Sequence, residues 1–125
     1  MREIKFRAWI KELNEIREVE YINFWKKMIS FPNKFCKEYY LNADFDEIEL
    51  MQYTGLKDIR GKEIYEGDIV TLHNSRYKVI FNTEEARYVL RDDEFEMNIP
   101  FTNNNNERME VLGNVYENPE LLGEQ

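Results

Sequence analysis

The stretch from Leu50 to Leu72 constrains the fold more than any other part of this chain. Three glycines, Gly55, Gly61 and Gly67, interrupt short runs of Tyr, Ile, Val and Thr at nearly regular intervals. Short β-branched and aromatic runs separated by turn residues are typical of small antiparallel barrels and meanders. We therefore predict a mainly β fold, and nothing in this stretch predicts a reaction.

Two turns are predicted inside this stretch. Asp58 and Gly61 suit the first turn, because an aspartate can cap it and a glycine supplies the positive φ that it needs. Gly67 and Asp68 suit the second turn, after which a new strand is expected to begin. Gly55 is predicted to break the strand that precedes both turns.

Before this stretch, alternating apolar and polar residues predict a strand over residues 4–10, with Ile4 and Phe6 facing inward. A second strand is expected to end near Tyr21. From there, apolar residues recur at helical spacing as far as Pro32, which disfavours helix at the residue before it. We therefore predict an irregular or partly helical segment after Tyr21.

Further strands are predicted after the glycine-rich stretch. Tyr77–Phe81 and Arg87–Leu90 suit a hairpin that closes over a polar turn. Arg108–Tyr116 suits the last strand, with Gly113 as a bulge. Four consecutive asparagines, Asn103–Asn106, suit a tolerant loop tip.

Length and composition exclude several classes of protein. A chain of 125 residues with 42% hydrophobic content can bury a core of its own. No apolar run approaches the roughly 18 residues that cross a bilayer, and Met1–Lys5 does not lead into a signal peptide, so we expect a cytoplasmic protein with no membrane partner. The one cysteine, Cys36, and the one histidine, His73, are too few for an intrachain disulfide or a zinc site. Cys36 is expected to pack as a small hydrophobic residue.

The net charge of −8 is unevenly distributed along the chain. Residues 1–41 hold nine Lys/Arg and six Asp/Glu, whereas residues 42–125 hold eight Lys/Arg and nineteen Asp/Glu, a net of −11. Because an acidic surface repels phosphate backbones, duplex binding by the whole chain is disfavoured. Solubility explains the asymmetry by default, and pairing of the basic end of one copy with the acidic end of another is the alternative.

Few residues are candidates for chemistry. Asp58 and Asp68 suit an acid–base pair, but each stands where turn chemistry already favours an aspartate. His73 has no local Ser or Cys nucleophile, so a surface position is predicted. A loop of four carboxylates lacks the glycine and the terminal glutamate of a calcium loop, and it is predicted to be solvated. These carboxylates are Asp92, Asp93, Glu94 and Glu96. We predict no catalytic, metal-binding or cofactor-binding residue, and no enzyme.

Aromatic residues are concentrated in the net-positive first third, where they alternate with lysines. Stacking platforms for single-stranded nucleic acid use this mixture, at about 1–3 kcal/mol per stacked base. The competing interpretation is a core or a subunit interface, where aromatic residues supply much of the energy. We favour the interface, because a small barrel has too little interior for all these rings. The candidate interface residues are Trp9, Phe24, Trp25, Phe31, Phe35, Tyr39 and Tyr40.

Four blocks of the sequence carry a resemblance: Met1–Trp9, Leu50–Asp58, Gly61–Val70 and Leu112–Leu122. In this order they resemble the blocks of the YopX protein family of bacteriophages and prophages. The resemblance implies a small phage-encoded protein of unknown biochemical function, with an SH3-like β-barrel in its carboxy-terminal part, and makes homo-oligomeric assembly an expectation. No catalytic residues are established for the family, so none are carried over. Ile10 stands where the family usually has an aspartate, and residues 11–47 match nothing distinctive.

Two regions are therefore predicted: residues 1–47, with a strand and an aromatic-rich segment, and residues 48–125, with the SH3-like barrel. The predicted function is that of a non-enzymatic phage or prophage accessory protein in the bacterial host cytoplasm, which acts by homo-oligomerisation and by binding a host or phage protein. The first alternative is a nucleic-acid-associated module that uses the basic aromatic third. The second is an acidic decoy of a host DNA-binding protein.

Overall fold

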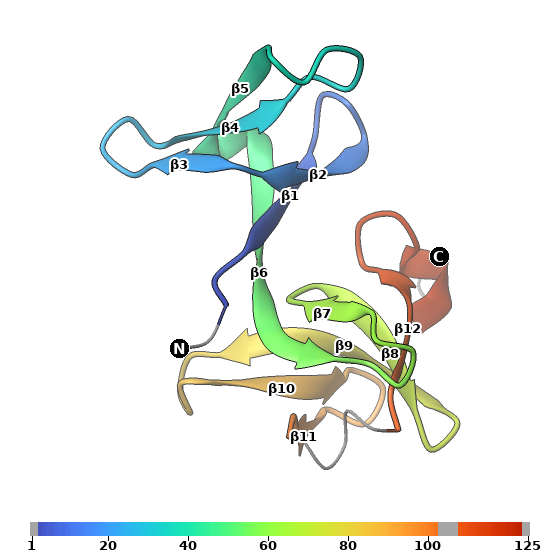
Figure 1. Cartoon of the computed structure of the whole chain (residues 1–125). Helices are drawn as coiled ribbons and strands as arrows, with labels where there is room; N and C mark the ends of the chain where they lie inside the picture. The colour runs from blue at the N-terminus through green and yellow to red at the C-terminus, as the bar shows by residue number, and fades with distance from the viewer. Residues whose placement is uncertain (1–2, 103–107, 124–125) are drawn as a thin grey trace. The chain divides into compact units, whose positions relative to one another are not determined.

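The computed structural model describes residues 3–102 and 108–123, and antiparallel β-strands dominate it (Figure 1). The predicted mainly β class is confirmed. The strands are β1 (Phe6–Ile10), β2 (Glu15–Val19), β3 (Tyr21–Asn23), β4 (Met28–Pro32), β5 (Tyr40–Asp44), β6 (Ile48–Lys57), β7 (Glu63–Tyr65), β8 (Asp68–Leu72), β9 (Ser75–Asn82), β10 (Arg87–Asp92), β11 (Met97–Pro100) and β12 (Glu110–Asn114). Two short 3-10 turns also occur among the described residues, η1 (Phe45–Glu47) and η2 (Pro119–Leu122).

The chain forms two compact units, which we name the N-terminal unit, Ile4–Gln52, and the C-terminal unit, from Tyr53 onward. The division falls within β6, a few residues after the boundary at residue 48 that the sequence suggests. The first half of β6 pairs with β1 in the N-terminal unit, and its second half pairs with β7 in the C-terminal unit. One strand therefore contributes to both units.

The N-terminal unit contains β1 between β2 and β6, and a three-stranded sheet in the order β3-β4-β5. In β1, Ala8 and Ile10 are buried, as the alternating pattern requires. Ile4 is 63% exposed, so its predicted inward position is wrong, because the strand begins only at Phe6. The buried core consists of Ala8, Ile10, Ile29, Phe31, Ala43 and Ile48.

The predicted helical segment after Tyr21 is wrong, because β3 and β4 form an antiparallel hairpin there. Ile22 and Ile29 are paired across the two strands, so a spacing of seven residues that fits two helical turns also fits a tight hairpin. Trp25 does not share their face and lies in the turn between the strands. At the end of that turn Lys27 has a φ of 54°, which a continuing helix does not allow.

The C-terminal unit contains a five-stranded antiparallel sheet in the order β11-β10-β9-β8-β12. The predicted hairpin is confirmed, since Val89 lies opposite Ile80 and Leu90 lies opposite Val79 in the β9–β10 pair. The predicted loop tip Asn103–Asn106 lies outside the described residues. The core of this unit consists of Ile64, Val70, Leu72, Tyr77, Val79, Leu90 and Met109.

Gly55 does not end β6 as predicted, because the strand continues through it to Lys57. The pairing with β7 is irregular between Tyr53 and Lys57, and Gly55 has a φ of 92° inside this irregular stretch. Glycine adopts this conformation without steric cost, so the strand bends here without ending.

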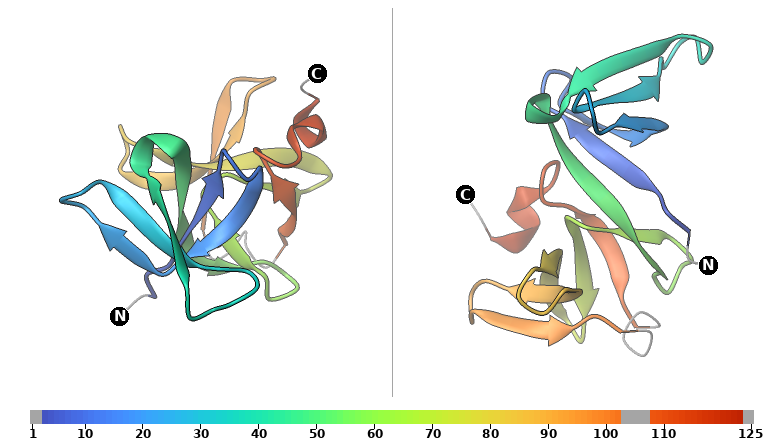
Figure 2. Two further views of the ribbon diagram at one scale, coloured as in Figure 1. Left: turned by 90° about the horizontal axis from the view of Figure 1, so that it is seen from above. Right: turned by 90° about the vertical axis from the view of Figure 1, so that its left-hand side faces the viewer.

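The pairing of β12 with β8 shifts register between Val111 and Gly113, which is a bulge. A Cβ atom added to Gly113 would overlap the side chain of Asn118. The Asn118 Oδ1 accepts a hydrogen bond from the Asn114 backbone N–H at 3.2 Å, so this close approach closes the turn after β12. The 3-10 turn η2 follows directly and is the red coil at the end of the chain in Figure 2.

Candidate functional site

Hydrogen bonds hold the β3–β4 turn, Phe24–Lys27, in a defined shape. The Asn23 Oδ1 accepts from the Lys26 N–H at 2.9 Å, and the Lys27 carbonyl accepts from the Phe45 N–H at 2.9 Å. The Phe24 ring meets the Phe45 ring edge-on, with centroids 6.2 Å apart. Trp25 stands at the tip and is 93% exposed. We name Phe24–Lys27 the tryptophan tip.

The β4–β5 loop is a second ordered turn that exposes an aromatic ring. The Asn33 Oδ1 accepts from the backbone N–H groups of Phe35 at 2.8 Å and Cys36 at 3.2 Å. The Asn33 N–H in turn donates to the Tyr39 carbonyl at 2.7 Å. Phe35 is 96% exposed on this loop. Cys36 is also exposed, so its predicted packing as a core residue is wrong, because the loop turns it to solvent.

Tyr21 and Tyr40 come from the two edge strands of the β3-β4-β5 sheet, and their ring centroids lie 5.4 Å apart. A hydrogen bond with the Glu20 carboxylate, assisted by desolvation, raises the pKa of Tyr40 to about 12. Its hydroxyl is therefore protonated, and a donor, throughout the physiological range.

Two candidate interface residues have other positions. Phe31 is 2% exposed and belongs to the core of the N-terminal unit, so its assignment to an interface is wrong. The guanidinium carbon of Arg17 lies 5.0 Å from the centroid of the Phe31 ring. Trp9 is half-buried within β1. The exposed candidates are Phe24, Trp25, Phe35, Tyr39 and Tyr40.

The N-terminal unit also contains a small apolar groove of about 230 Å³, which sequence reasoning did not identify. Leu13, 43% exposed, and Leu41, 38% exposed, contribute partly open apolar surface, and buried core residues complete the lining. Two carboxylates, Glu12 and Glu47, also line it. We name this site the leucine groove; its lining residues are Ile10, Glu12, Leu13, Phe31, Leu41, Asn42, Ala43 and Glu47.

Three carboxylates near η1, those of Asp44, Asp46 and Glu47, place ligand oxygens within 4.8 Å of one another. All three residues are exposed. The Glu47 Oε1 accepts a hydrogen bond from the Asp44 N–H at 2.9 Å. Capping of the 3-10 turn explains the position of Glu47, so the group needs no cation.

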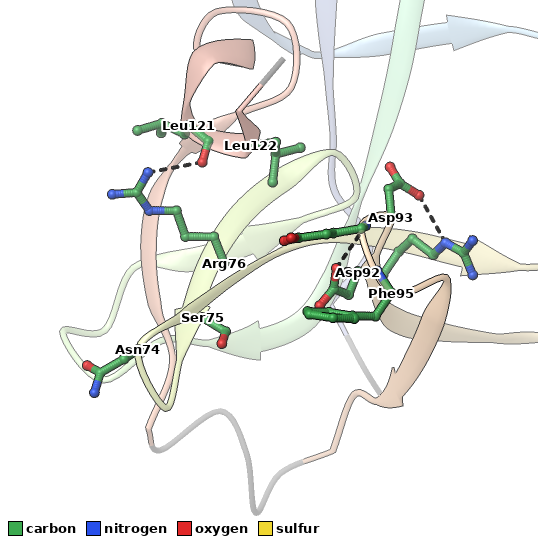
Figure 3. Close-up of a pocket in the computed structure, with 10 residues that line it drawn as sticks. Asn74, Ser75, Arg76, Asp92, Asp93, Phe95, Leu121 and Leu122 are labelled. Atoms are coloured by element: carbon green, nitrogen blue, oxygen red, sulfur yellow. Dashed lines mark hydrogen bonds and ion pairs between the residues drawn. The ribbon is translucent and has the colours of Figure 1, made fainter.

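A hollow of about 430 Å³ lies in the C-terminal unit (Figure 3). Arg76 donates to the Leu121 carbonyl at 3.0 Å, and Arg91 donates to the Asp93 carboxylate at 3.0 Å. Asp93 also pairs with Lys78 at 2.7 Å, and these hydrogen bonds to Lys78 and Arg91 lower the pKa of Asp93. The Asp93 carboxylate is therefore paired with two cations of the same unit. Its lining residues are Asn74, Ser75, Arg76, Arg91, Asp92, Asp93, Glu94, Phe95, Leu121 and Leu122.

Of the predicted acidic loop, Asp92 accepts from the backbone N–H groups of Glu94 at 3.0 Å and Phe95 at 3.3 Å. Glu96 has a φ of 52°, within the same turn. His73 has a φ of 52° in the turn between β8 and β9. These residues shape hairpin turns, and the structure does not gather them into one group of ligands.

Asp58 is buried at the first predicted turn and joins two distant segments. Its Oδ1 accepts from the N–H groups of Arg60 at 2.9 Å and Lys62 at 2.8 Å, and its Oδ2 accepts from the Val111 N–H at 2.9 Å. Burial by itself would raise the pKa of Asp58, but these N–H donors outweigh it and lower the pKa. The carboxylate therefore connects the turn to β12.

Asp68 is buried at the second predicted turn, and its Oδ2 accepts from the Tyr65 N–H at 2.8 Å. Gly67, with a φ of 89°, donates to the Val79 carbonyl at 2.8 Å and accepts from the Val115 N–H at 2.9 Å. Gly61 has a φ of 83°. Asp58 and Asp68 thus accept hydrogen bonds from the backbone in separate turns, which gives each a structural use.

When charges are counted by compact unit, their distribution differs from the one obtained by dividing the sequence after residue 41. Residues 4–52 hold eight Lys/Arg and nine Asp/Glu, so the N-terminal unit is nearly neutral. Four carboxylates of the acidic stretch 42–125 belong to this unit: Asp44, Asp46, Glu47 and Glu49. The aromatic rings therefore lie on a neutral unit and not on a basic one.

Comparisons with known proteins bear on the fold and the family. The crystal structure of protein EF1440 from Enterococcus faecalis is similar to this chain, with a TM-score of 0.70 and 24% sequence identity over 98% of this chain and 99% of that chain. No curated protein matches the sequence. No helix among the described residues is long and apolar enough to cross a membrane. Residues 5–123 match the family model described as YopX protein. The chain therefore belongs to the YopX protein family.

Proposed function

We propose that this chain is a non-enzymatic phage or prophage accessory protein of the bacterial cytoplasm, which acts by homo-oligomerisation and by partner binding. The observation that carries the proposal is the exposure of Trp25 and Phe35, at 93% and 96%, on turns held by backbone hydrogen bonds. Large rings on ordered turns add nothing to their own core and are suited to bind a partner, since aromatic residues dominate interface energies.

The C-terminal unit has the role of a scaffold in this proposal, and we propose an SH3-like barrel for it. Support comes from its five-stranded antiparallel sheet and its buried cluster around Val70, Val79 and Leu90. Small barrels of this type serve many partners, so the barrel is compatible with the proposed function without specifying it.

The non-enzymatic part of the proposal rests on how the carboxylates are used. Asp58 and Asp68 each accept backbone hydrogen bonds, and Asp93 is paired with Lys78 and Arg91. Incubation of the protein with single- and double-stranded DNA and RNA, with magnesium or manganese, should yield no cleavage. Cleavage that disappears in Asp68→Asn or Asp58→Asn would overturn this part of the proposal.

Light scattering of the full chain at micromolar concentration tests the proposal. The mass should lie well above the 15.3 kDa of one chain, and Trp25→Ala should lower it. A monomer for both wild type and variant would contradict self-association.

The alternative function with specific support is binding of single-stranded nucleic acid. Lys26 and Lys27 follow Trp25, and Lys34 precedes Phe35, as stacking platforms require. The near-neutral N-terminal unit gives such a platform little electrostatic attraction. A salt-dependent mobility shift with single-stranded DNA would favour this alternative, and specific capture of a host DNA-binding protein would favour the acidic decoy.

A further inference from the structure

The tryptophan tip and the leucine groove are compatible in size and in chemistry. The tip presents one indole, 93% exposed, and the groove offers about 230 Å³ with Leu13 and Leu41 partly open to solvent. An apolar cavity of roughly 150 Å³ holds a benzene molecule, so the groove has room for the larger indole ring. Tryptophan is the residue most enriched among the side chains that dominate binding energy.

The charges beside the tip and the groove are also complementary. Lys26 and Lys27 follow Trp25 directly, and neither makes an ion pair with another residue in the described parts of the chain. Glu12 and Glu47 line the groove, and within the same residues neither carboxylate has an ion-pair partner. The tip therefore carries two cations and the groove two anions that a second molecule can pair.

The other fully exposed ring lacks this match. Phe35 has lysines on both sides, Lys34 and Lys37, and one of them, Lys34, pairs with Glu15 at 3.4 Å within the same molecule. Phe95, which is 68% exposed on a turn of the C-terminal unit, is the control ring, because the proposed contact uses only the N-terminal unit.

We propose that the tryptophan tip of one copy inserts into the leucine groove of a second copy, with Lys26 and Lys27 facing Glu12 and Glu47. The partner is a second copy of this chain. The inference rests on the proposed function, because it names the surfaces through which self-association occurs. Each molecule carries both a tip and a groove, so two copies can make this contact reciprocally.

Single substitutions measured by sedimentation over a range of micromolar concentrations give the first test. Trp25→Ala, Leu13→Arg and Glu12→Lys should each raise the dissociation constant, by roughly 30-fold for Trp25→Ala, which is the size of a hot-spot loss. Phe95→Ala and Glu18→Lys, the controls for ring and charge, should leave it within about threefold. Thermal unfolding of each variant shows that it remains folded.

A mixing experiment gives the second test and does not depend on one variant. Trp25→Ala keeps its groove and Leu13→Arg keeps its tip, so each should be monomeric alone. Mixed, they should recover a complex of two chains, since one tip and one groove remain complementary. The absence of a complex on mixing would overturn the proposal, as would equal losses for Phe95→Ala and Trp25→Ala.

The sedimentation measurements distinguish this inference from the proposed function. A wild-type chain that is monomeric throughout contradicts both of them. A wild-type oligomer whose dissociation constant is unchanged by Leu13→Arg and Glu12→Lys contradicts only the contact between tip and groove.

Discussion

Three turns of the C-terminal unit are held by buried polar groups, whereas two turns of the N-terminal unit carry almost fully exposed aromatic rings. Asp58, Asp68 and Asn114 are buried and accept backbone hydrogen bonds. Trp25 and Phe35 are almost fully exposed on turns that are equally well defined. Buried hydrogen-bonded groups stabilise a fold, and exposed rings contribute little to it. The contrast supports the proposal that the first set of turns stabilises the fold and that the second contacts partners.

Removal of the Asp58 carboxylate should show the largest effect. Asp58→Ala leaves the N–H groups of Arg60, Lys62 and Val111 without their acceptor, and we expect a loss of about 3 kcal/mol in the free energy of unfolding. Asp46→Ala, at an exposed turn of the N-terminal unit, is the control and should stay within about 0.5 kcal/mol. Urea denaturation measures the free energy of unfolding of both variants. Equal losses would contradict the difference between the turns of the two units.

Substitution of Gly67 should have the next largest effect. A β-branched side chain is strained at a φ of 89°, so Gly67→Val should lower the free energy of unfolding by about 2 kcal/mol. Thr71→Val introduces the same side chain into β8 at an ordinary strand position and serves as control. Thermal denaturation should distinguish the two variants. A Gly67→Val protein as stable as wild type would contradict the strain expected at this turn.

Protonation of Asp58 should cost less than its removal, because a carboxylic acid keeps acceptor capacity. Its folded-state pKa lies below the ordinary value of 3.8, so its contribution is complete above the unfolded-state pKa and is lost as the pH falls through the folded-state value. The wild-type free energy of unfolding should therefore decline below about pH 4 more steeply than that of Asp58→Asn. Parallel curves for the two proteins would show that Asp58 does not titrate with unfolding.

The smallest effect on stability is expected at the exposed rings. Trp25→Ala and Phe35→Ala should each change the free energy of unfolding by no more than about 0.5 kcal/mol, because almost none of either ring is buried. Urea denaturation at a concentration low enough to dissociate any oligomer measures this directly. A loss of the size expected for Gly67→Val would place these rings among the stabilising groups.

Local residue patterns predict the C-terminal unit better than the N-terminal unit. Gly61 and Gly67 indicate turns by residue type alone, and the hairpin of β9 and β10 follows from two short strand patterns with a polar turn between them. The hydrogen bond between the Asp58 carboxylate and the Val111 N–H was not predictable, because it joins segments that only the fold brings together.

In the N-terminal unit, the same spacing supports two structures. Ile22 and Ile29 are seven residues apart, which fits a helix and also fits the β3–β4 hairpin that forms. Residue type could not distinguish Phe31, which is buried, from Trp25, which is exposed, since both are aromatic residues near lysines. The leucine groove has no local signal, because Leu13 lies in the β1–β2 turn and Leu41 lies in β5, far apart in the sequence.

Hydrogen exchange of the full chain at low and high micromolar concentration tests the division of roles most directly. The account predicts that higher concentration slows exchange in the N-terminal unit, around the tip Phe24–Lys27 and the groove segments 10–13 and 41–47, while exchange from Tyr53 onward stays the same. Concentration-dependent protection confined to strands of the C-terminal unit would contradict it, because the contact surface would then belong to the unit assigned to stability.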